Sequence, residues 1–172
     1  KGILSALDQH KVKATFFITT GNMSDENSAI LDMAKEHGHQ FGNHTHGHLN
    51  LNNVTAPEYS KDIDRCSELA RKWINSEYFR YSYLRRGDTP EKRNYVLSHL
   101  QNRNMIVAPV TIDNNEWVYN RDYSKARNRN DAEEMERQLK DYLQHMSEMS
   151  EKYRAMGVEI MGREVDHILL IH

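Results

Sequence analysis

Three histidines spaced two residues apart form the densest group of candidate metal ligands in the chain. Neutral imidazole is the commonest protein ligand for zinc and similar metals, which can activate a bound water for hydrolysis. His44 and His48 can converge on one ion across a turn, whereas an extended segment would place all three histidines on one face. Gly42 and Gly47 favour a strand that ends in a turn. The expected ligands are therefore His44 and His48, with His46 as a neighbour, and a solvated histidine-rich loop is the other interpretation.

The elements that must position these histidines alternate between strand and helix patterns. Strands are expected at residues 12–19, just before His44, and at 79–84, 105–112 and 167–172. Helices are expected at residues 3–10, 25–38, 55–76, 90–100 and 131–156, with residues 118–131 as a polar loop. Such alternation is typical of parallel βα units, which form either a barrel or an open doubly wound sheet.

The polar and aromatic residues that could do chemistry follow the ends of these expected strands. They are His44, the segment 80–83, the segment 113–117 and His172. In both parallel architectures the functional residues gather at the carboxyl ends of the strands. The sequence therefore predicts one active site to which all four segments contribute.

Length and composition limit what this site can belong to. The chain has 172 residues, of which 38% are hydrophobic, so it can bury one real core and is expected to form a single domain over residues 1–172. A formal net charge of −2 gives no reason to expect nucleic-acid binding, and no apolar run is long enough to span a membrane. Cys66 is the lone cysteine, which excludes an internal disulfide framework.

The segment His44-Thr45-x-x-His48 resembles the H-[ST]-x-x-H motif of the polysaccharide deacetylases, carbohydrate esterase family four. The resemblance implies a distorted (β/α) barrel with parallel strands and a divalent metal, usually zinc, held by the two histidines. Thr45 would support the loop. It also implies a hydrolase that removes acetyl groups from N- or O-acetylated polysaccharide or oligosaccharide, in a secreted or cell-envelope protein.

Other segments resemble further motifs of the same family. Lys13-Ala14-Thr15-Phe16-Phe17 is similar to an early strand, Arg80-Tyr81-Ser82-Tyr83 to R-x-P-[FYW], Asp113-Asn114-Asn115-Glu116-Trp117 to D-x-x-D-W, and Leu170-Ile171-His172 to L-x-H. Two positions depart from these patterns: Ser82 stands where proline is usual, and Glu116 where a second aspartate is usual.

The resemblance also implies a role for each matching residue. Arg80 would hold the catalytic aspartate, Asp113 would orient Arg80, and His172 would be the general acid. The acetyl and sugar pocket would be lined by Tyr83, Trp117 and Leu170. Because Arg80 and Asp113 follow neighbouring strands, we expect them to form a buried or half-buried ion pair beside the metal.

The family's first motif, T-F-D-D-G, which supplies the catalytic base and a third metal ligand, does not occur in the chain. We expect it upstream of residue 1, so that the barrel is cropped at both ends, marginally stable and inactive by itself. Two other classes of function stay open. The chain could be a non-catalytic carbohydrate-binding relative, or an interaction protein whose helix at 131–156 docks a partner, although an apolar stripe on that helix is more often core-facing.

Overall fold

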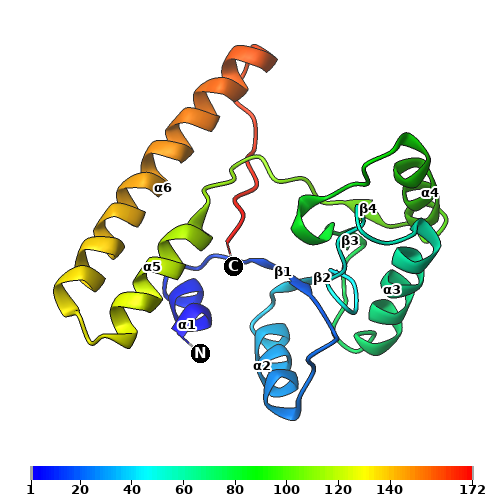
Figure 1. Cartoon of the computed structure of the whole chain (residues 1–172), viewed down its shortest axis with the longest axis horizontal. Coiled ribbons are helices and arrows are strands. Elements are labelled where there is room, and N and C mark those ends of the chain that lie inside the picture. Colours follow the sequence, from blue (N-terminus) through cyan, green and yellow to red (C-terminus); the bar gives the residue numbers. More distant parts are fainter. Residues whose placement is uncertain (1, 172) are drawn as a thin grey trace. The chain divides into compact units, whose positions relative to one another are not determined.

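A computed structural model describes residues 2–171, and the chain divides into two compact units, Lys1–Ala108 and Pro109–His172. Helices alternate with parallel strands along the chain, which confirms the predicted α/β class (Figure 1). That the whole chain forms one domain stays a prediction.

The first unit is built on a parallel sheet in the order β1-β2-β3-β4. Its strands are β1 (Thr15–Ile18), β2 (Gln40–Asn43), β3 (Tyr78–Phe79) and β4 (Ile106–Val107). Asn43, the last residue of β2, pairs with both Ile18 and Phe79, the last residues of its two neighbours. His44 and Arg80, which follow directly, therefore leave the sheet at the same edge.

Side-chain caps begin three of the helices of this unit. The helices of this unit are α1 (Gly2–Gln9), α2 (Asp25–Glu36), α3 (Ala56–Leu69) and α4 (Pro90–Gln101), with a 3₁₀ turn η1 (Ser82–Leu84). Ser24, Thr55 and Thr89 each accept a hydrogen bond from the backbone N–H three residues later. Such caps satisfy donors that the first helical turn leaves unpaired, so they fix where each helix starts.

Helix α3 joins two hydrophobic clusters. Its Tyr59 and Ile63 pack in one cluster with Phe79 of β3, and its Cys66 packs in the other with Phe41 of β2. All five side chains are fully buried, and each large apolar one contributes about 1.5–3 kcal/mol. Helix α3 is therefore held firmly beneath the ends of β2 and β3.

The second unit consists mainly of two helices, α5 (Glu116–Asn128) and α6 (Ala132–Met161). Helix α5 corrects the prediction of a polar loop over residues 118–131. Asp122 forms ion pairs with Arg121 and Lys125, and α5 packs against α6. These interactions stabilise a helix although the apolar residues of the segment show only a weak helical pattern. Helix α6 also runs beyond the predicted residue 156 to Met161, where it is capped by Gly162, whose φ of 68° favours glycine.

The apolar stripe of α6 is only partly covered within the second unit. Met135, Tyr142 and Met146 are half-buried, whereas Leu139 and Leu143 are exposed. The predicted core-facing stripe is thus a half-covered one, and the docking of a partner on it stays a prediction.

The strand predicted at 12–19 is shortened to β1, Thr15–Ile18, and three other predicted strands are reduced further. The strand predicted at 79–84 stops at Phe79 because η1 and the left-handed residues Tyr83 and Leu84 follow. The strand predicted at 105–112 is reduced to β4 and a single parallel bridge from Ile112 to Leu169, since Pro109 has no N–H to donate. The last predicted strand, at 167–172, is likewise reduced to this bridge within residues 167–171.

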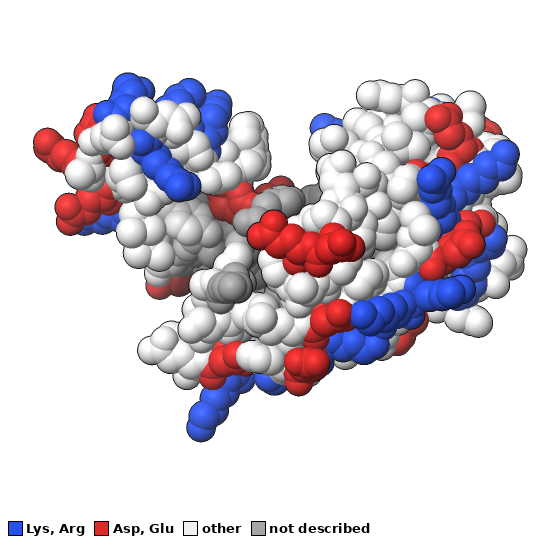
Figure 2. Space-filling view, turned by 90° about the horizontal axis from the view of Figure 1, so that it is seen from below, with Lys and Arg blue, Asp and Glu red and all other residues white. Residues whose placement is uncertain are grey.

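Charges of both signs are interspersed on the surface. Figure 2 shows Lys and Arg side chains lying among Asp and Glu side chains over the face in view. Over residues 2–171, no helix combines the length and the apolar composition that crossing a bilayer requires.

Candidate functional site

The segment after β2 is a tight turn that brings His44 and His48 together. Their ring centroids are 4.9 Å apart and the ring planes are inclined by 71°. The turn is not helical: Thr45 and His48 adopt left-handed backbone angles, with φ of 68° and 52°. Non-glycine residues take this conformation only when their surroundings hold them there. The expected strand end and turn are confirmed, and the two imidazoles face one small region of space.

His44 is oriented by the backbone of the neighbouring strand end. Its Nδ1 lies 2.7 Å from the carbonyl oxygen of Arg80. Because a carbonyl can only accept, Nδ1 carries the proton, and the lone pair of the neutral ring is on Nε2. Histidine ligands in metal sites are usually fixed in this way, so the donor set at this position fits a metal ion.

Asn43 supports the turn from the last position of β2. Its Oδ1 accepts a hydrogen bond of 2.9 Å from the backbone N–H of Thr45. Its Nδ2 donates to the carbonyl oxygen of Ile63 and to Oγ of Ser67, both on α3. A fully buried amide thus ties the start of the histidine turn to the helix beneath it.

Asp62 on α3 holds the other end of the turn. Both of its carboxylate oxygens accept from the backbone N–H of Gly47, at 3.1 and 2.9 Å. Its carbonyl oxygen accepts from the backbone N–H of His46, and the carbonyl of His46 accepts in turn from Gly21. A Cβ at Gly21 would lie 2.8 Å from that carbonyl oxygen, so this close approach requires glycine.

His46 faces away from the pair toward β1. Its Nδ1 lies 2.9 Å from Oγ1 of Thr20, a buried residue just after that strand. Within residues 2–171 an edge-to-face ring contact joins His44 to His48, and none involves His46. The geometry therefore supports the prediction that His46 is a neighbour rather than a ligand, and metal binding itself stays a prediction.

Arg80 is buried where β3 ends. Its backbone N–H donates to the carbonyl oxygen of Asn43, and its guanidinium lies 4.1 Å from the centre of the Phe17 ring. Burial lowers the pKa of Arg80 from its usual value. The aromatic face offsets part of the cost of burying this charge.

Ser82 makes two contacts that a proline could not. Its backbone N–H donates to the hydroxyl of Tyr59 at 3.2 Å, and its Oγ lies 3.2 Å from Oγ1 of Thr45. Burial raises the pKa of Tyr59 to about 12, so the phenol stays protonated. Serine therefore replaces the rigidity of proline with hydrogen bonds that join the segment 80–83 to the histidine turn.

Tyr83 lies directly against the histidine pair. Its ring centroid is 4.5 Å from that of His48, and the residue remains 60% exposed. A left-handed φ of 54° turns its side chain out of the strand path. An exposed aromatic ring beside two imidazoles can contact a ligand that approaches them.

The other predicted residues lie in the second unit, where Asn114 is the centre of the hydrogen bonding. Its Nδ2 donates to the carbonyl oxygen of Leu170, and its Oδ1 accepts from the backbone N–H of Glu116. His145 on α6 donates to its carbonyl oxygen at 2.8 Å. Asn114 is buried, and sequence reasoning missed it because these partners lie up to 56 residues away.

Asp113 and Trp117, which lie within three residues of Asn114 along the chain, are exposed, whereas Leu170 is half-buried. Asp113 is exposed and accepts a 3.4 Å hydrogen bond from the backbone of Asn115, while Trp117 is 57% exposed on the first turn of α5. Glu116 is buried, whereas the carboxylate of Asp113 is exposed to solvent.

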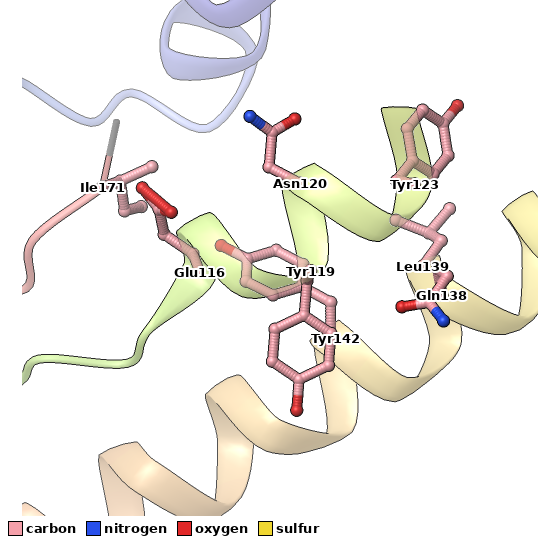
Figure 3. Close-up of a pocket in the computed structure, with 8 residues that line it drawn as sticks. All are labelled: Glu116, Tyr119, Asn120, Tyr123, Gln138, Leu139, Tyr142 and Ile171. Atoms are coloured by element: carbon pink, nitrogen blue, oxygen red, sulfur yellow. The ribbon is translucent and has the colours of Figure 1, made fainter. Parts of the chain in front are cut away.

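A cavity of about 240 Å³ lies along α5 and α6 in the same unit. Figure 3 shows that side chains from one face of each helix line it together with Ile171. The helical residues are Glu116, Tyr119, Asn120, Tyr123, Gln138, Leu139 and Tyr142. The ring centroids of Tyr119 and Tyr142 are 5.7 Å apart, so aromatic packing between the helices forms part of the wall.

The structure thus brings together His44, His48, Arg80 and Tyr83 within the first unit. Asp113, Trp117 and Leu170 belong to the second unit, and His172 lies outside the described residues. It stays a prediction that the two sets meet in one site and that Arg80 and Asp113 form an ion pair.

Over residues 2–171, no group of three His, Cys, Asp or Glu side chains could hold a metal ion together. The histidine pair fits two positions of a coordination sphere, and other ligands must complete it.

Comparison with known proteins gives a family match over most of the first unit. A sequence model described as polysaccharide deacetylase matches residues 1–103. A peptidoglycan-N-acetylglucosamine deacetylase of Bacillus cereus is 31% identical over 117 residues, which is 67% of this chain and 40% of that protein. The chain therefore spans less than half the length of this relative.

Solved structures of related enzymes share the fold. A peptidoglycan N-acetylglucosamine deacetylase is similar with a TM-score of 0.57 and 27% identity, over 68% of this chain and 52% of the other. A family 4 acetyl xylan esterase from Clostridium thermocellum, solved with a cobalt ion, gives a TM-score of 0.54 at 21% identity, over 69% and 56%. These similarities confirm the predicted barrel class of α/β fold with parallel strands.

Proposed function

The chain belongs to the polysaccharide deacetylase family, and we propose that it acts in a metal-dependent hydrolase that removes acetyl groups from an acetylated polysaccharide. The observation that carries the proposal is the pairing of His44 and His48, with the Nδ1 proton of His44 held by the Arg80 carbonyl. The relative from Bacillus cereus suggests an N-acetylglucosamine polymer as the substrate to try first.

Nε2 of His44 and the imidazole of His48 would hold a divalent cation, for which we propose zinc. A cation bound there supplies an acidified water and a positive charge beside the acetyl carbonyl. The exposed Tyr83 would contact the sugar ring, and its backbone N–H would stabilise negative charge on the carbonyl oxygen. The reaction consumes one water per acetyl group and releases acetate and a free amine or alcohol.

Arg80, Asp113 and His172 would stabilise charge or transfer a proton. Arg80, already buried at the strand end, would keep the catalytic carboxylate ionised, and Asp113 would orient its guanidinium. His172 would donate a proton to the leaving nitrogen or oxygen, a task that suits an imidazole near neutral pH. The base and the third ligand would come from the aspartates of the family's first motif.

Acetate release tests the proposal directly. Full-length protein would be incubated with an N-acetylglucosamine oligomer or with O-acetylated xylan, first untreated, then with a chelator, and then with zinc restored. We expect acetate release that the chelator abolishes and zinc restores, and no release by a His48→Ala variant. Binding of either oligosaccharide without any acetate release would replace the hydrolase with the non-catalytic carbohydrate-binding alternative.

A further inference from the structure

The walls of the cavity between α5 and α6 are largely aromatic. Tyr119 and Tyr123 of α5 and Tyr142 of α6 line it, and all three residues are half-buried. Leu139 and Ile171 complete the apolar part of the lining. The face of an aromatic ring carries partial negative charge, so it attracts the C–H groups of a ligand and, more strongly, a cation. A ligand with an apolar face therefore suits this wall.

Two carboxamides add hydrogen-bonding groups to the cavity. Nε2 of Gln138 donates to Glu134 at 2.9 Å, and no donor among residues 2–171 bonds to the Gln138 side-chain oxygen. The carboxamide of Asn120 forms no hydrogen bond within the described part of the chain, and this residue is exposed. A carboxamide both donates and accepts, which matches the hydroxyl groups of a sugar. A ring with C–H groups on its face and hydroxyl groups at its edge fits both sets of side chains.

Glu116 gives one end of the cavity a negative charge. Figure 3 shows its side chain at the end of the cavity away from Tyr123. This charge reaches Tyr142, because burial raises the pKa of that phenol and the Glu116 carboxylate raises it further. Among the described residues, no Lys, Arg or His side chain lines the cavity. The cavity therefore favours a cation over an anion.

The size of the cavity limits the ligand to about one ring. Its volume of about 240 Å³ lies below the roughly 300–1,000 Å³ of pockets for drug-sized molecules. The exposed residues Asn120 and Leu139 belong to its lining, so the cavity opens to the surface. One sugar unit can thus enter while the rest of a glycan chain stays outside.

We propose that this cavity binds one amino sugar unit of a glycan in its ammonium form. The C–H face of the ring packs on the tyrosines, the ring hydroxyls bond to Asn120 and Gln138, and the ammonium group lies toward Glu116. None of the described lining residues belongs to the histidine turn, so the cavity is a second site.

The inference rests on the proposed function for the origin of this ligand. Water cleaves the amide C–N bond of an N-acetylated unit and leaves acetic acid and an amine. The proton of the acid then moves to the amine, which gives acetate and an ammonium group. The cavity accordingly holds a unit of the polymer that has already lost its acetyl group.

Titration of a variant without the histidine site measures this binding alone. Full-length His48→Ala would be titrated calorimetrically with a glucosamine trimer and with an N-acetylglucosamine trimer, in a buffer below the pKa of the amine. We expect the Kd of the glucosamine trimer to be about three- to fivefold tighter, the worth of one cation–aromatic contact at a partly exposed site. The unchanged protein should bind this trimer with the same Kd. Equal Kd values for the two trimers, or loss of binding in His48→Ala, would overturn the proposal.

Variants of the lining locate the binding. Asn120→Ala/Tyr123→Ala removes a hydrogen-bonding group and an aromatic ring, so it should weaken the Kd of the glucosamine trimer by about tenfold. Because Asn120 is exposed, Asn120→Ala alone should fold normally and weaken the Kd by about threefold. Glu116→Gln removes the charge and should bring the Kd values of the two trimers together.

Tyr153→Leu changes a half-buried tyrosine of α6 outside the lining, and it serves as the matched control. Its Kd for the glucosamine trimer should equal that of the unchanged protein. An unchanged Kd in both Asn120→Ala and Asn120→Ala/Tyr123→Ala would mean that the trimer binds elsewhere, and an equal loss in Tyr153→Leu would mean that the loss is not specific to the cavity. Either result contradicts the proposal.

Binding in the cavity and acetate release have separate outcomes. If the glucosamine trimer binds as expected and the protein releases no acetate from an acetylated polymer, the cavity site stands and the proposed function fails. If the protein releases acetate but His48→Ala shows no preference for the glucosamine trimer, the proposed function stands and the cavity site fails.

Discussion

The Nδ1 atom of His44 and the backbone oxygen of Arg80 lie 2.7 Å apart at the joint end of two parallel strands. The contact uses the main chain of Arg80, while its side chain turns to the face of Phe17. One residue therefore serves the site in two separable ways, through a carbonyl that no substitution removes and through a guanidinium that substitution can change.

Arg80→Lys should consequently lower turnover and spare metal binding. The carbonyl that orients His44 remains, but lysine lacks the planar fork that would hold a carboxylate. We expect kcat to fall about a hundredfold, the lower range for loss of acid–base function, and zinc affinity to stay within about threefold. Asp113→Asn should show the same pattern. Near-normal kcat in both variants of the full-length protein would exclude the predicted Arg80–Asp113 pair.

Asp62→Ala should loosen the histidine turn, because the carboxylate is the acceptor for the Gly47 backbone N–H. Supporting groups of this kind typically change metal affinity by about 10- to 100-fold. Zinc affinity would be measured by competition with a chelator of known affinity. Glu68→Gln, on the exposed side of the same helix, is the control and should have no effect. An unchanged affinity in Asp62→Ala would show that the turn keeps its shape without this anchor.

Ser82→Pro should destabilise the protein even though proline is usual in the family at this position. The change removes the donor to the Tyr59 hydroxyl and leaves that buried group unpaired, at a cost of about 1–3 kcal/mol. Tyr59→Phe removes the other partner. In urea unfolding of the full-length protein the double variant should therefore cost clearly less than the sum of the two single changes. Strict additivity would mean that the two groups do not interact.

His39 should make stability depend on pH. It is buried, its Nδ1 accepts a 3.2 Å hydrogen bond from the backbone N–H of Ala14, and burial together with Lys13 lowers its pKa below 6.5. Between the folded and unfolded pKa values the unfolded chain binds more protons, so the free energy of unfolding should fall as pH drops below about 6.5. The slope should approach but not exceed about 1.4 kcal/mol per pH unit.

His39→Asn keeps an acceptor for Ala14 and removes the titrating group, so it isolates this effect. Its free energy of unfolding should vary less between pH 7.5 and pH 5.5 than that of the unchanged protein. Asp8 and His37 lie near enough to act on the pKa of His39, and they remain in both proteins. Parallel pH profiles for the two would assign the dependence to other groups.

Much of the fold could be predicted because its signals are local. Ser24, Thr55 and Thr89 mark helix starts by their own side-chain chemistry, and the structure uses all three. Pro109 marks the interruption of a predicted strand. Helix α5 was missed because its sequence is mostly polar, and its helical state depends on ion pairs and on packing against α6.

Candidate site residues could be predicted from type and spacing for His44 and His48, and from the resemblance to the R-x-P-[FYW] motif for Arg80. Two supporting residues were not found: Asp62, which anchors the histidine turn, and Asn114, which organises the hydrogen bonds of the second unit. Their side chains form hydrogen bonds with backbone groups 15 and 56 residues away, and no spacing in the sequence indicates such contacts. The turn itself also needs left-handed angles at Thr45 and His48, residue types that rarely signal that conformation.

Metal binding by single alanine variants tests the central claim most directly. Zinc content and affinity of the full-length protein would be measured for His44→Ala, His48→Ala and His46→Ala, with folding of each checked by thermal unfolding. The geometry predicts that His44→Ala and His48→Ala lose zinc by at least about a hundredfold in affinity, while His46→Ala, whose ring faces Thr20, keeps it within a few-fold. Equal loss of zinc in His46→Ala and His44→Ala would contradict the account.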